Sequence, residues 1–462
     1  MGYRLGVFAG EGLNEGVLRE AIEEHVKRTV PRLSRLWAYF RNPDEGRGGK
    51  RRLAQEAGLP SRLTGGTSAW EDDRAALRRE VVIENDIGWR IQAMVDFVAG
   101  RGPAIRSEAG GETGAQIERV MGAVFEASGG AGMLQEAALL AHVYGHVDFL
   151  VRREGSASGE DAGVRIGIVE PTRAFPILDP DDYRRMLAYV VHFPRRVPGP
   201  GGFRTSWYTE ILTGGARQVY EDEALVDEHV GATGARGWNA PPVVHVQNIA
   251  QPFRYEGIGE VEGLIPLQDE LNTRLSDRAS RVTLQSFKMY LAKGIEGFDR
   301  VPVAPGQVWR TDNPDAEIVG FGGDASSPSE DAHIEQVREA MDKTSGVPPL
   351  AGGVVRAKIG NLSSANALRV TLLSVLSRTA RKRAAYARAI GTLGEMVLGM
   401  LDDSGVLATE PRARRVRVVW PDPLPEDLHA RVENVRTKAS LGAERGELLE
   451  ELGHVGGTGS IE

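Results

Sequence analysis

The sequence predicts an α+β fold, and three observations lead to that prediction. Segments with helical spacing of apolar residues lie toward both ends of the 462-residue chain. Short β-prone runs separated by Gly, Pro and Asp turns fill residues 134–245, which indicates a mostly antiparallel sheet. Two polar helical segments enclose a further group of short strands at residues 288–327. Because the chain is too long for one typical core, two to four structural units are expected.

The first part of the chain predicts three helices. Apolar residues recur at helical spacing over residues 14–41, and Pro31 predicts a break in that helix. Residues 85–99 carry a stronger amphipathic pattern, which the run "GRGP" ends. A third helical pattern covers residues 115–128.

The middle of the chain predicts strands and then a polar helix. The expected strands are "DFLVRR", "VRIGIV", "MLAYVVHF", "SWYTEIL" and "PVVHVQNI". Residues 259–287 have only a narrow apolar stripe, together with the i,i+4 charge pairs Glu270–Arg274 and Asp277–Arg281. A helix that polar needs partners on several sides.

The C-terminal part predicts more helix than strand. A second polar helix follows the expected N-cap Ser329 and ends near residue 345. Residues 365–403 give one long helical pattern, in which Gly391 and Gly394 predict a kink. The chain then predicts a strand and two short helices, at residues 415–420 and on either side of Leu441 and Gly442.

Composition excludes several classes of protein. The chain is 41% hydrophobic and 26% charged, which is ordinary globular usage. Its net charge of −8 argues against binding DNA or an anionic membrane through bulk charge alone. With no cysteine in the sequence, disulfides, Cys-based metal sites and a Cys nucleophile are excluded. The N-terminal residues lack the apolar core of a signal peptide, and no apolar run is long enough for a membrane span, so a cytosolic, soluble protein is expected.

A search for catalytic or metal-binding motifs finds none that is specific. "GRGGKR" at residues 46–51 lacks the spacing of a phosphate loop. His142 and His146 have metal-ligand spacing, but Gly145 separates them, so structural histidines are expected. "DPDDY" at residues 179–183 indicates a turn followed by a helix N-cap. Two basic clusters, residues 378–388 and 412–417, predict solvated faces or contacts to acidic neighbours, with nucleic-acid contact as the alternative.

The stretch beginning "SGVPPLAGG" at residue 345 separates two strong helical patterns without fitting either. It continues to about residue 364, is rich in Gly, Pro and Ser, and carries Arg356 and Lys358 with no acidic residue. Loops of this length are uncommon in compact domains and are usually functional or disordered. A plain connector is the alternative interpretation.

The order of several segments resembles the portal proteins of tailed bacteriophages, which form the ring at one capsid vertex through which DNA is packaged and ejected. The segments are "ENDIGWRIQAMVDFVAGRGPAI", "EAALLAHVYGHVDFLVRR", "PVVHVQNIAQPFRYEGIGEVEGLIPLQDELNTRLSD", "SGVPPLAGG" with "GNLSSANALRV", and "VWPDPLPED". Each is weak alone, and their order along most of the chain carries the resemblance.

The resemblance implies a division of the chain into the parts of a portal subunit. A mixed α/β wing would comprise residues 1–258 and, with the long helix and a strand, residues 365–420. The helical stem would comprise 259–287 and 328–345, and a small α/β clip would lie between them at 288–327. A tunnel loop projecting into the channel would occupy 346–364, and a short helical crown would occupy 421–462.

The resemblance also implies site residues and partners. About twelve copies would form a closed ring, and double-stranded DNA would pass through it. Terminase large subunit would dock on the clip, and the major capsid protein and head-completion or adaptor proteins would contact the ring. The implied site residues are Arg356, Lys358 and Asn361 in the channel, Glu270, Arg274, Asp277, Arg278 and Arg281 between stems, and Lys293, Arg300, Trp309 and Arg310 on the clip.

The resemblance implies no enzymatic activity and no cofactor, because the packaging energy would come from the separate terminase ATPase. The protein would be assembled in the host cytoplasm and located in the virion. Two alternatives remain: an α+β enzyme whose site is not recognised, and a scaffold or minor capsid protein without a channel. Mass in solution distinguishes a large ring from a small enzyme.

Overall fold

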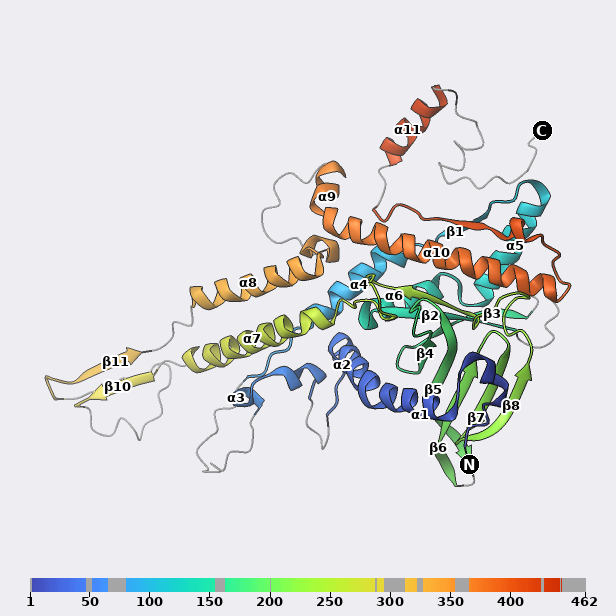
Figure 1. The fold of residues 1–462 in the computed structure, drawn as a ribbon. Helices are drawn as coiled ribbons and strands as arrows, with labels where there is room; N and C mark the ends of the chain where they lie inside the picture. Colours follow the sequence, from blue (N-terminus) through green and yellow to red (C-terminus); the bar gives the residue numbers. More distant parts are fainter. Residues whose placement is uncertain are drawn as a thin grey trace. The chain divides into compact units, whose positions relative to one another are not determined.

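The computed structural model is a mixed α+β protein, as the sequence predicts. It describes residues 2–46, 52–64, 80–153, 163–199, 201–286, 289–294, 312–321, 327–353, 365–424, 428–440 and 442. The chain divides into two units, which are described separately below. Unit 1 comprises Met1–Ser34, Arg90–Glu260 and Val347–Glu462, and unit 2 comprises Arg35–Trp89 and Val261–Gly346. Figure 1 labels the elements of both.

Besides the strand pair β1–β12, unit 1 contains two larger antiparallel sheets, which confirms the predicted sheet type. The three-stranded sheet has the order β3-β2-β9, and the five-stranded sheet has the order β4-β5-β6-β7-β8. The strands are β2 (His146–Arg153), β3 (Val164–Val169), β4 (Ala174–Leu178), β5 (Met186–Gly199), β6 (Gly202–Leu212), β7 (Ala216–Glu221), β8 (Ala224–Val230) and β9 (Val243–Gln247).

The N-terminal residues complete the core of the five-stranded sheet. A 3₁₀ turn (Gly6–Glu11) and α1 (Glu15–Glu24) carry apolar side chains that pack against one face of β5, β6 and β7. The buried residues of this cluster include Tyr3, Leu5, Phe8, Leu18, Ala188, Val190, Ile211 and Tyr220.

The predicted helix break near Pro31 is wrong. The chain stays helical from α1 through a π-helical turn (His25–Thr29) into α2 (Val30–Arg41). The backbone N–H of Val30 donates to the carbonyl of His25, which is the wider spacing of a π turn. Because proline has no N–H and crowds the preceding turn, a locally wider turn accommodates Pro31 where a regular one would not.

Helices cover the three-stranded sheet of unit 1. α5 (Gly111–Ala127), α6 (Gly130–Tyr144) and α10 (Leu373–Asp403) pack against its strands, and α10 also contacts β12 (Val416–Val419). β12 pairs with β1 (Ala104–Ser107), which follows α4 (Asp86–Ala99). These elements confirm the helices predicted at residues 85–99 and 115–128 and the strand predicted at 415–420.

The long C-terminal helix is broken, but not at the predicted glycines. α9 (Ala365–Thr371) ends at Leu372, where the backbone leaves helical geometry, and α10 then continues through Gly391 and Gly394. A Cβ on Gly394 would lie 2.5 Å from a methyl carbon of Val416. Glycine here lets β12 approach the helix closely.

Three glycines allow two backbone segments of unit 1 to cross in contact. Gly145 ends α6 with φ +98°, a left-handed conformation that favours glycine and lets β2 start at once. A Cβ on Gly145 would overlap the carbonyl oxygen of Gly257, and one on Gly257 would overlap that of Gly145. A Cβ on Gly259 would lie 2.7 Å from the carbonyl oxygen of Val143. Larger residues at these points would separate the segments.

Unit 2 is built on two helices, α7 (Ile265–Ser286) and α8 (Pro328–Ser345), which pack against each other (Figure 1). Both polar helices are therefore present, although α7 begins six residues later than the predicted segment. β10 (Met289–Lys293) and β11 (Glu317–Phe321) form an antiparallel pair between them in the sequence. The N-cap of α8 is Ser327 and not Ser329, because Pro328 occupies the first helical position, where its missing N–H is not needed.

Two smaller elements complete the description. α3 (Ser61–Thr64) belongs to unit 2, and α11 (Leu428–Ser440) belongs to unit 1. Gly442 has φ +92°, which agrees with the predicted interruption after residue 440. The second short helix predicted beyond it lies outside the described residues.

Candidate functional site

The polar face of α7 holds an extended segment of its own chain. Gln268, Asn272, Ser276 and Ser280 recur every four residues and so lie on one side of the helix. The backbone N–H groups of Ile87, Glu84, Val82 and Glu80 donate to these four side chains in turn, at 3.1, 3.0, 3.0 and 3.0 Å. This side-chain ladder takes the place of a neighbouring β-strand.

Further hydrogen bonds bury the inner end of the ladder. Gln268 and Asn272 are fully buried, and the Asn272 amide donates to the side-chain oxygen of Gln55 at 3.0 Å. Gln55 in turn donates to the Asn85 side chain and to the carbonyl of Tyr39. The polar character of α7 is therefore satisfied inside one chain. The sequence showed the recurring Gln, Asn, Ser and Ser, but not the distant segment that they bind.

The five charged residues predicted to lie between stems also have partners within the chain. Glu270 pairs with Arg274 at 2.7 Å, as predicted, and Asp277 accepts from Arg62 and Arg274. Across the helix pair, Arg278 binds Asp331 at 3.0 Å and Arg281 binds Glu330. The last two of these ion pairs connect α7 to α8. Their additional role between subunits stays a prediction.

Most of the residues predicted for the clip and the tunnel loop lie outside the described residues: Arg300, Trp309, Arg310, Arg356, Lys358 and Asn361. Lys293 is described, at the end of β10, where it pairs with Glu317 of β11 at 3.4 Å. Val347, at the start of the predicted tunnel loop, is described. The buried side chain of Arg90 donates to its carbonyl at 2.8 Å.

A buried ion pair joins α10 to the segment after β9. Lys382, only 3% exposed, donates to Oε1 of Glu260. The Asn248 side chain donates to Oε2 of Glu260 at 2.8 Å, and Nε2 of His142 lies 3.9 Å from the same oxygen. Of the two environments predicted for this basic cluster, Lys382 has the contact to an acidic neighbour and not the solvated face.

The charges of this cluster depend on one another. Burial lowers the pKa of Lys382, and the attraction of Glu260 opposes that effect. Burial disfavours the charged form of Glu260, but its charged neighbours and hydrogen bonds outweigh this and lower its pKa overall. Burial also lowers the pKa of His142 to about 4, so this histidine is neutral near pH 7. The cluster therefore holds one cation and one anion away from water.

Arg383, next to the ion pair, is also buried. Its guanidinium donates to the carbonyls of Val98 and Phe97 at the end of α4, at 3.1 and 2.9 Å, and to that of Pro421. It also lies over the Trp420 ring, 5.0 Å from the centroid. The sequence contained a signal for this burial. Lys382 and Arg383 each lie three or four residues from both Thr379 and Tyr386, which belong to the predicted buried face of the helix. The second basic cluster also meets an acidic neighbour, as predicted, with Arg414 bound to Asp402 at 2.7 Å.

A second buried polar cluster surrounds Asp148 on β2. Its carboxylate accepts from Tyr189 at 2.8 Å and Tyr255 at 2.7 Å, and it contacts Nδ1 of His245 at 2.7 Å. Burial opposes ionisation of Asp148, but its bonds to His245 and Tyr255 lower its pKa overall. Burial lowers the pKa of the neighbouring His146 to about 4.

The predicted structural histidines are therefore buried, but they are not fully satisfied. Nε2 of His142 and Nδ1 of His146 have no hydrogen-bond partner in the described part of the chain. Within that part, no group of three side chains is arranged to hold a metal ion. The "DPDDY" turn is present, with Asp179 bound to Arg185 at 3.0 Å, but β5 follows it where a helix was predicted.

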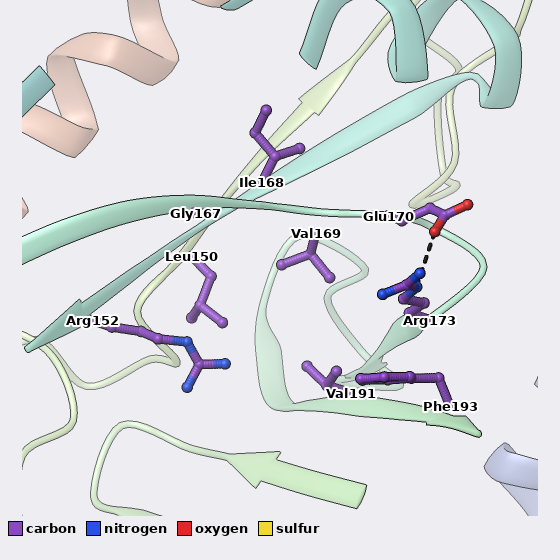
Figure 2. A pocket seen from close by; sticks show the side chains of 9 residues that line it. All are labelled: Leu150, Arg152, Gly167, Ile168, Val169, Glu170, Arg173, Val191 and Phe193. Atoms are coloured by element: carbon purple, nitrogen blue, oxygen red, sulfur yellow. Dashed lines mark ion pairs between the residues drawn. The ribbon is translucent and has the colours of Figure 1, made fainter. Parts of the chain in front are cut away.

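Figure 2 shows a pocket of about 360 Å³ between β2, β3 and β5 of unit 1. Its wall is apolar at Leu150, Val169 and Val191, and its charged side chains are engaged. Arg173 pairs with Glu170 at 3.0 Å, and both terminal nitrogens of Arg152 bind the buried Glu210 at 2.5 Å. The bonds from Arg152 on β2 to Glu210 on β6 thus connect the three-stranded sheet to the five-stranded sheet.

Comparisons with known proteins find a matching family model and similar solved structures. A family model described as "Phage portal protein, SPP1 Gp6-like" matches residues 131–449. A chain from a structure titled "Virion of native gene transfer agent (GTA) particle" is 15% identical, with 79% of this chain and 89% of that chain covered and a TM-score of 0.43. A chain from "Neck of empty GTA particle computed with C6 symmetry" is 14% identical, with 85% and 97% covered and a TM-score of 0.43. No curated protein matches this chain. Among the described helices, none combines the length and apolarity that crossing a bilayer requires.

Proposed function

This chain belongs to the family of SPP1 Gp6-like phage portal proteins, and on that premise we propose that it is the structural subunit of a ring of about twelve copies. The ring forms the channel at one capsid vertex through which double-stranded DNA is packaged and ejected. The observation that carries the proposal is the extent of the family match, which runs from residue 131 to residue 449 and so spans elements of both units.

The proposed division follows the resemblance found in the sequence. Residues 1–258 and 365–420 form the wing, 421–462 the crown, and 346–364 the tunnel loop. The stem consists of 259–287 and 328–345, with the clip at 288–327. The packing of α7 on α8 and the strand pair β10–β11 between them in sequence support this assignment.

The charges refine how DNA would move through the ring. α8 carries five acidic residues, Glu330, Asp331, Glu335, Glu339 and Asp342, against the bases Arg338 and Lys343. α7 itself is balanced, with Asp269, Glu270 and Asp277 against Arg274, Arg278 and Arg281. We therefore assign repulsion of DNA to α8, and contact with phosphates to Arg356, Lys358 and Asn361.

The partners follow from the same proposal. Terminase large subunit docks on the clip at Lys293, Arg300, Trp309 and Arg310 and supplies the energy for packaging, so the ring itself needs neither catalysis nor a cofactor. The major capsid protein surrounds the ring, and head-completion or adaptor proteins bind it. The ring is assembled in the host cytoplasm and remains in the virion.

The experiment combines ring mass with DNA packaging. We expect the wild-type chain to form closed rings, and the double variant R356A/K358A to form rings of the same mass that package shorter DNA into procapsids. The loss arises from missing phosphate contacts, which carry no sequence information, so it should not depend on the DNA used.

K27A/R28A is the matched control, because both of its cations are exposed and pair only with nearby helix residues. It should package normally. A wild-type chain that stays monomeric at micromolar concentration contradicts the ring, whereas normal packaging by R356A/K358A contradicts the role of the loop.

A further inference from the structure

The loop that follows β9 is held rigidly by side chains from the strand. The amide nitrogen of Gln247 donates to the carbonyls of Arg254 and Tyr255, both at 2.9 Å, and its oxygen accepts from the N–H of Gln251 at 3.1 Å. Nε2 of His245 contacts the Tyr255 carbonyl at 2.8 Å, and the Tyr255 hydroxyl binds Asp148. The backbone of this loop therefore has one defined path.

At the tip of this loop, Phe253 combines strain with exposure. Its φ is +62°, and its side chain is 84% exposed, the highest value among the large exposed apolar residues of the described chain. The other described non-glycine residues with positive φ are Asn42, Asp222 and Glu223. Asparagine and aspartate adopt that conformation more readily than other non-glycine residues, whereas a bulky residue such as phenylalanine rarely does. Within unit 1 the ring contacts Tyr183, with centroids 5.8 Å apart. A strained backbone that presents an exposed aromatic ring indicates a contact outside the chain.

A complementary surface lies at the opposite edge of the five-stranded sheet. Tyr183 lies in the β4–β5 turn, whereas β8 is the strand at the far end of the sheet order. On β8, Val226 is 53% exposed and Val230 is 67% exposed. Of the two acidic residues between them, Asp227 pairs with Arg217 at 2.6 Å, and Glu228 accepts from the neutral Gln218 at 2.6 Å. Phe253 is followed by the exposed Arg254, and Glu228 has no cationic partner among the described residues, so the two surfaces are apolar and can also pair one positive with one negative charge.

The strand register sets both surfaces at the same end of the sheet. Tyr189, near the start of β5, pairs with Leu212, and Leu212 pairs with Arg217 at the start of β7. The neighbouring Ala216 pairs with Val230. A rotation about an axis parallel to the strands would bring the Phe253 loop of one copy against Val230 of the next.

We infer that, in the ring proposed above, the Phe253 loop of each subunit docks on the exposed β8 edge of its neighbour, around Val230. This inference rests on the proposed ring. A closed ring needs two different complementary surfaces on every subunit, and unit 1 supplies one at the Phe253 loop beside the β4–β5 turn and the other on β8. A rigid aromatic side chain loses little conformational freedom on binding, which makes Phe253 the expected energetic centre of the contact.

Because the chain has no cysteine, introduced cysteines test this contact directly. We expect F253C/V230C rings, treated with a short bismaleimide linker, to give a ladder of covalent oligomers on denaturing gels. A ladder arises because each subunit would be linked to two neighbours. F203C/V230C is the matched control: Phe203 is also an exposed phenylalanine, but it lies at the other end of β6. It should give no ladder.

A second measurement separates docking from folding. Phe253→Gly removes the ring and relieves the positive φ, so the unfolding midpoint should stay equal or rise. The concentration for half-maximal ring assembly should nevertheless rise at least about tenfold. Phe203→Gly should shift assembly less than about twofold.

The results of these experiments distinguish a failure of the Phe253 contact from a failure of the proposed ring. Rings that form normally but give no F253C/V230C ladder, or an F253G variant that assembles as well as wild type, overturn the inference and leave the ring intact. Covalent dimers from F253C alone would overturn it in favour of a loop that meets its own copy. If the wild-type chain forms no ring, both the ring and this contact are wrong.

Discussion

The two long helices α7 and α10 both bury polar side chains, but they do so in different ways. α7 uses the neutral side chains of Gln268, Asn272, Ser276 and Ser280 to bind backbone N–H groups one by one. α10 uses a buried cation, Lys382, whose single anionic partner is Glu260. Removing one neutral side chain from the ladder should lower the free energy of unfolding only modestly. Removing one charge of a buried ion pair should lower it more, because the other charge is left without compensation.

The largest expected effect comes from breaking the ion pair of α10. Lys382→Met should lower the free energy of unfolding by about 3–5 kcal/mol, since Glu260 would remain buried without its cation. The double variant K382M/E260Q should recover a large part of that loss, because the buried charge is gone. Chemical denaturation measures both. A loss below about 1 kcal/mol for K382M would mean that Glu260 reaches water.

The next largest effect is expected at low pH, where the region of His142 and His146 should lose more stability than the ladder of α7. The pKa of His142 and of His146 is lowered from 6.5 to about 4 in the folded chain, so the unfolded chain binds more protons as the pH falls through this window. Their contribution is fully present above pH 6.5 and is lost as the pH falls toward 4. For one histidine the loss is about 3 kcal/mol at most.

The neutral ladder of α7 has no such titration. Hydrogen exchange, corrected for the intrinsic pH dependence of the exchange rate, should therefore show protection lost in α6 and β2 at pH 5, with less change at the ladder. Equal loss in both regions would contradict the assignment of acid sensitivity to these histidines.

Within the ladder of α7, depth should decide the effect. Asn272→Ala removes an acceptor for the N–H of Glu84 and a donor to Gln55 in a buried place, so a loss of about 1–3 kcal/mol is expected. Ser280→Ala, at the exposed end, should change stability by less than about 0.5 kcal/mol. Thermal unfolding of the two variants measures the difference, and equal losses would show that the ladder fails as a unit.

The smallest effect is expected for the surface charges of the helix pair. Arg278 and Asp331 form an ion pair at 3.0 Å with side chains 39% and 58% exposed, so Arg278→Ala should reduce the stability of the isolated chain by less than about 1 kcal/mol. If Arg278 also lies between subunits, the same variant should weaken ring assembly in a salt-dependent way. Comparing monomer unfolding with ring dissociation at low and high salt separates the two roles.

The sequence carried the local structure better than the distant contacts. Apolar periodicity was sufficient for α4, α5 and α10, the N-terminal capping signal for α8, and short β-prone runs between turns for an antiparallel sheet. Pro31 and the pair Gly391 and Gly394 were misread because neighbouring backbone geometry and the close approach of β12 decide those places. Such packing depends on residues far away in the sequence.

The site residues divide in the same way. The Glu270–Arg274 pair is one helical turn long and could be predicted, whereas the partner of Lys382 lies more than one hundred residues away. The polar run on α7 was visible, but its interpretation needed residues 80–85 and the start of α4, whose backbone N–H groups it binds. Residues proposed to touch DNA and terminase, apart from Lys293, lie outside the described chain, so their roles depend on the proposed experiments.

The contact between Gly145 and Gly257 means that the chain leaves and returns to one point, with the three-stranded and five-stranded sheets of unit 1 built in the interval between them. Such an interval can change its length without moving the segments on either side. We expect relatives to gain or lose whole hairpins there, most readily at the β5–β6 end around Gly201, while keeping glycine at both sides of the crossing. The wing would then be the part of the molecule that adapts to different capsids through insertion, on a frame of helices that stays constant.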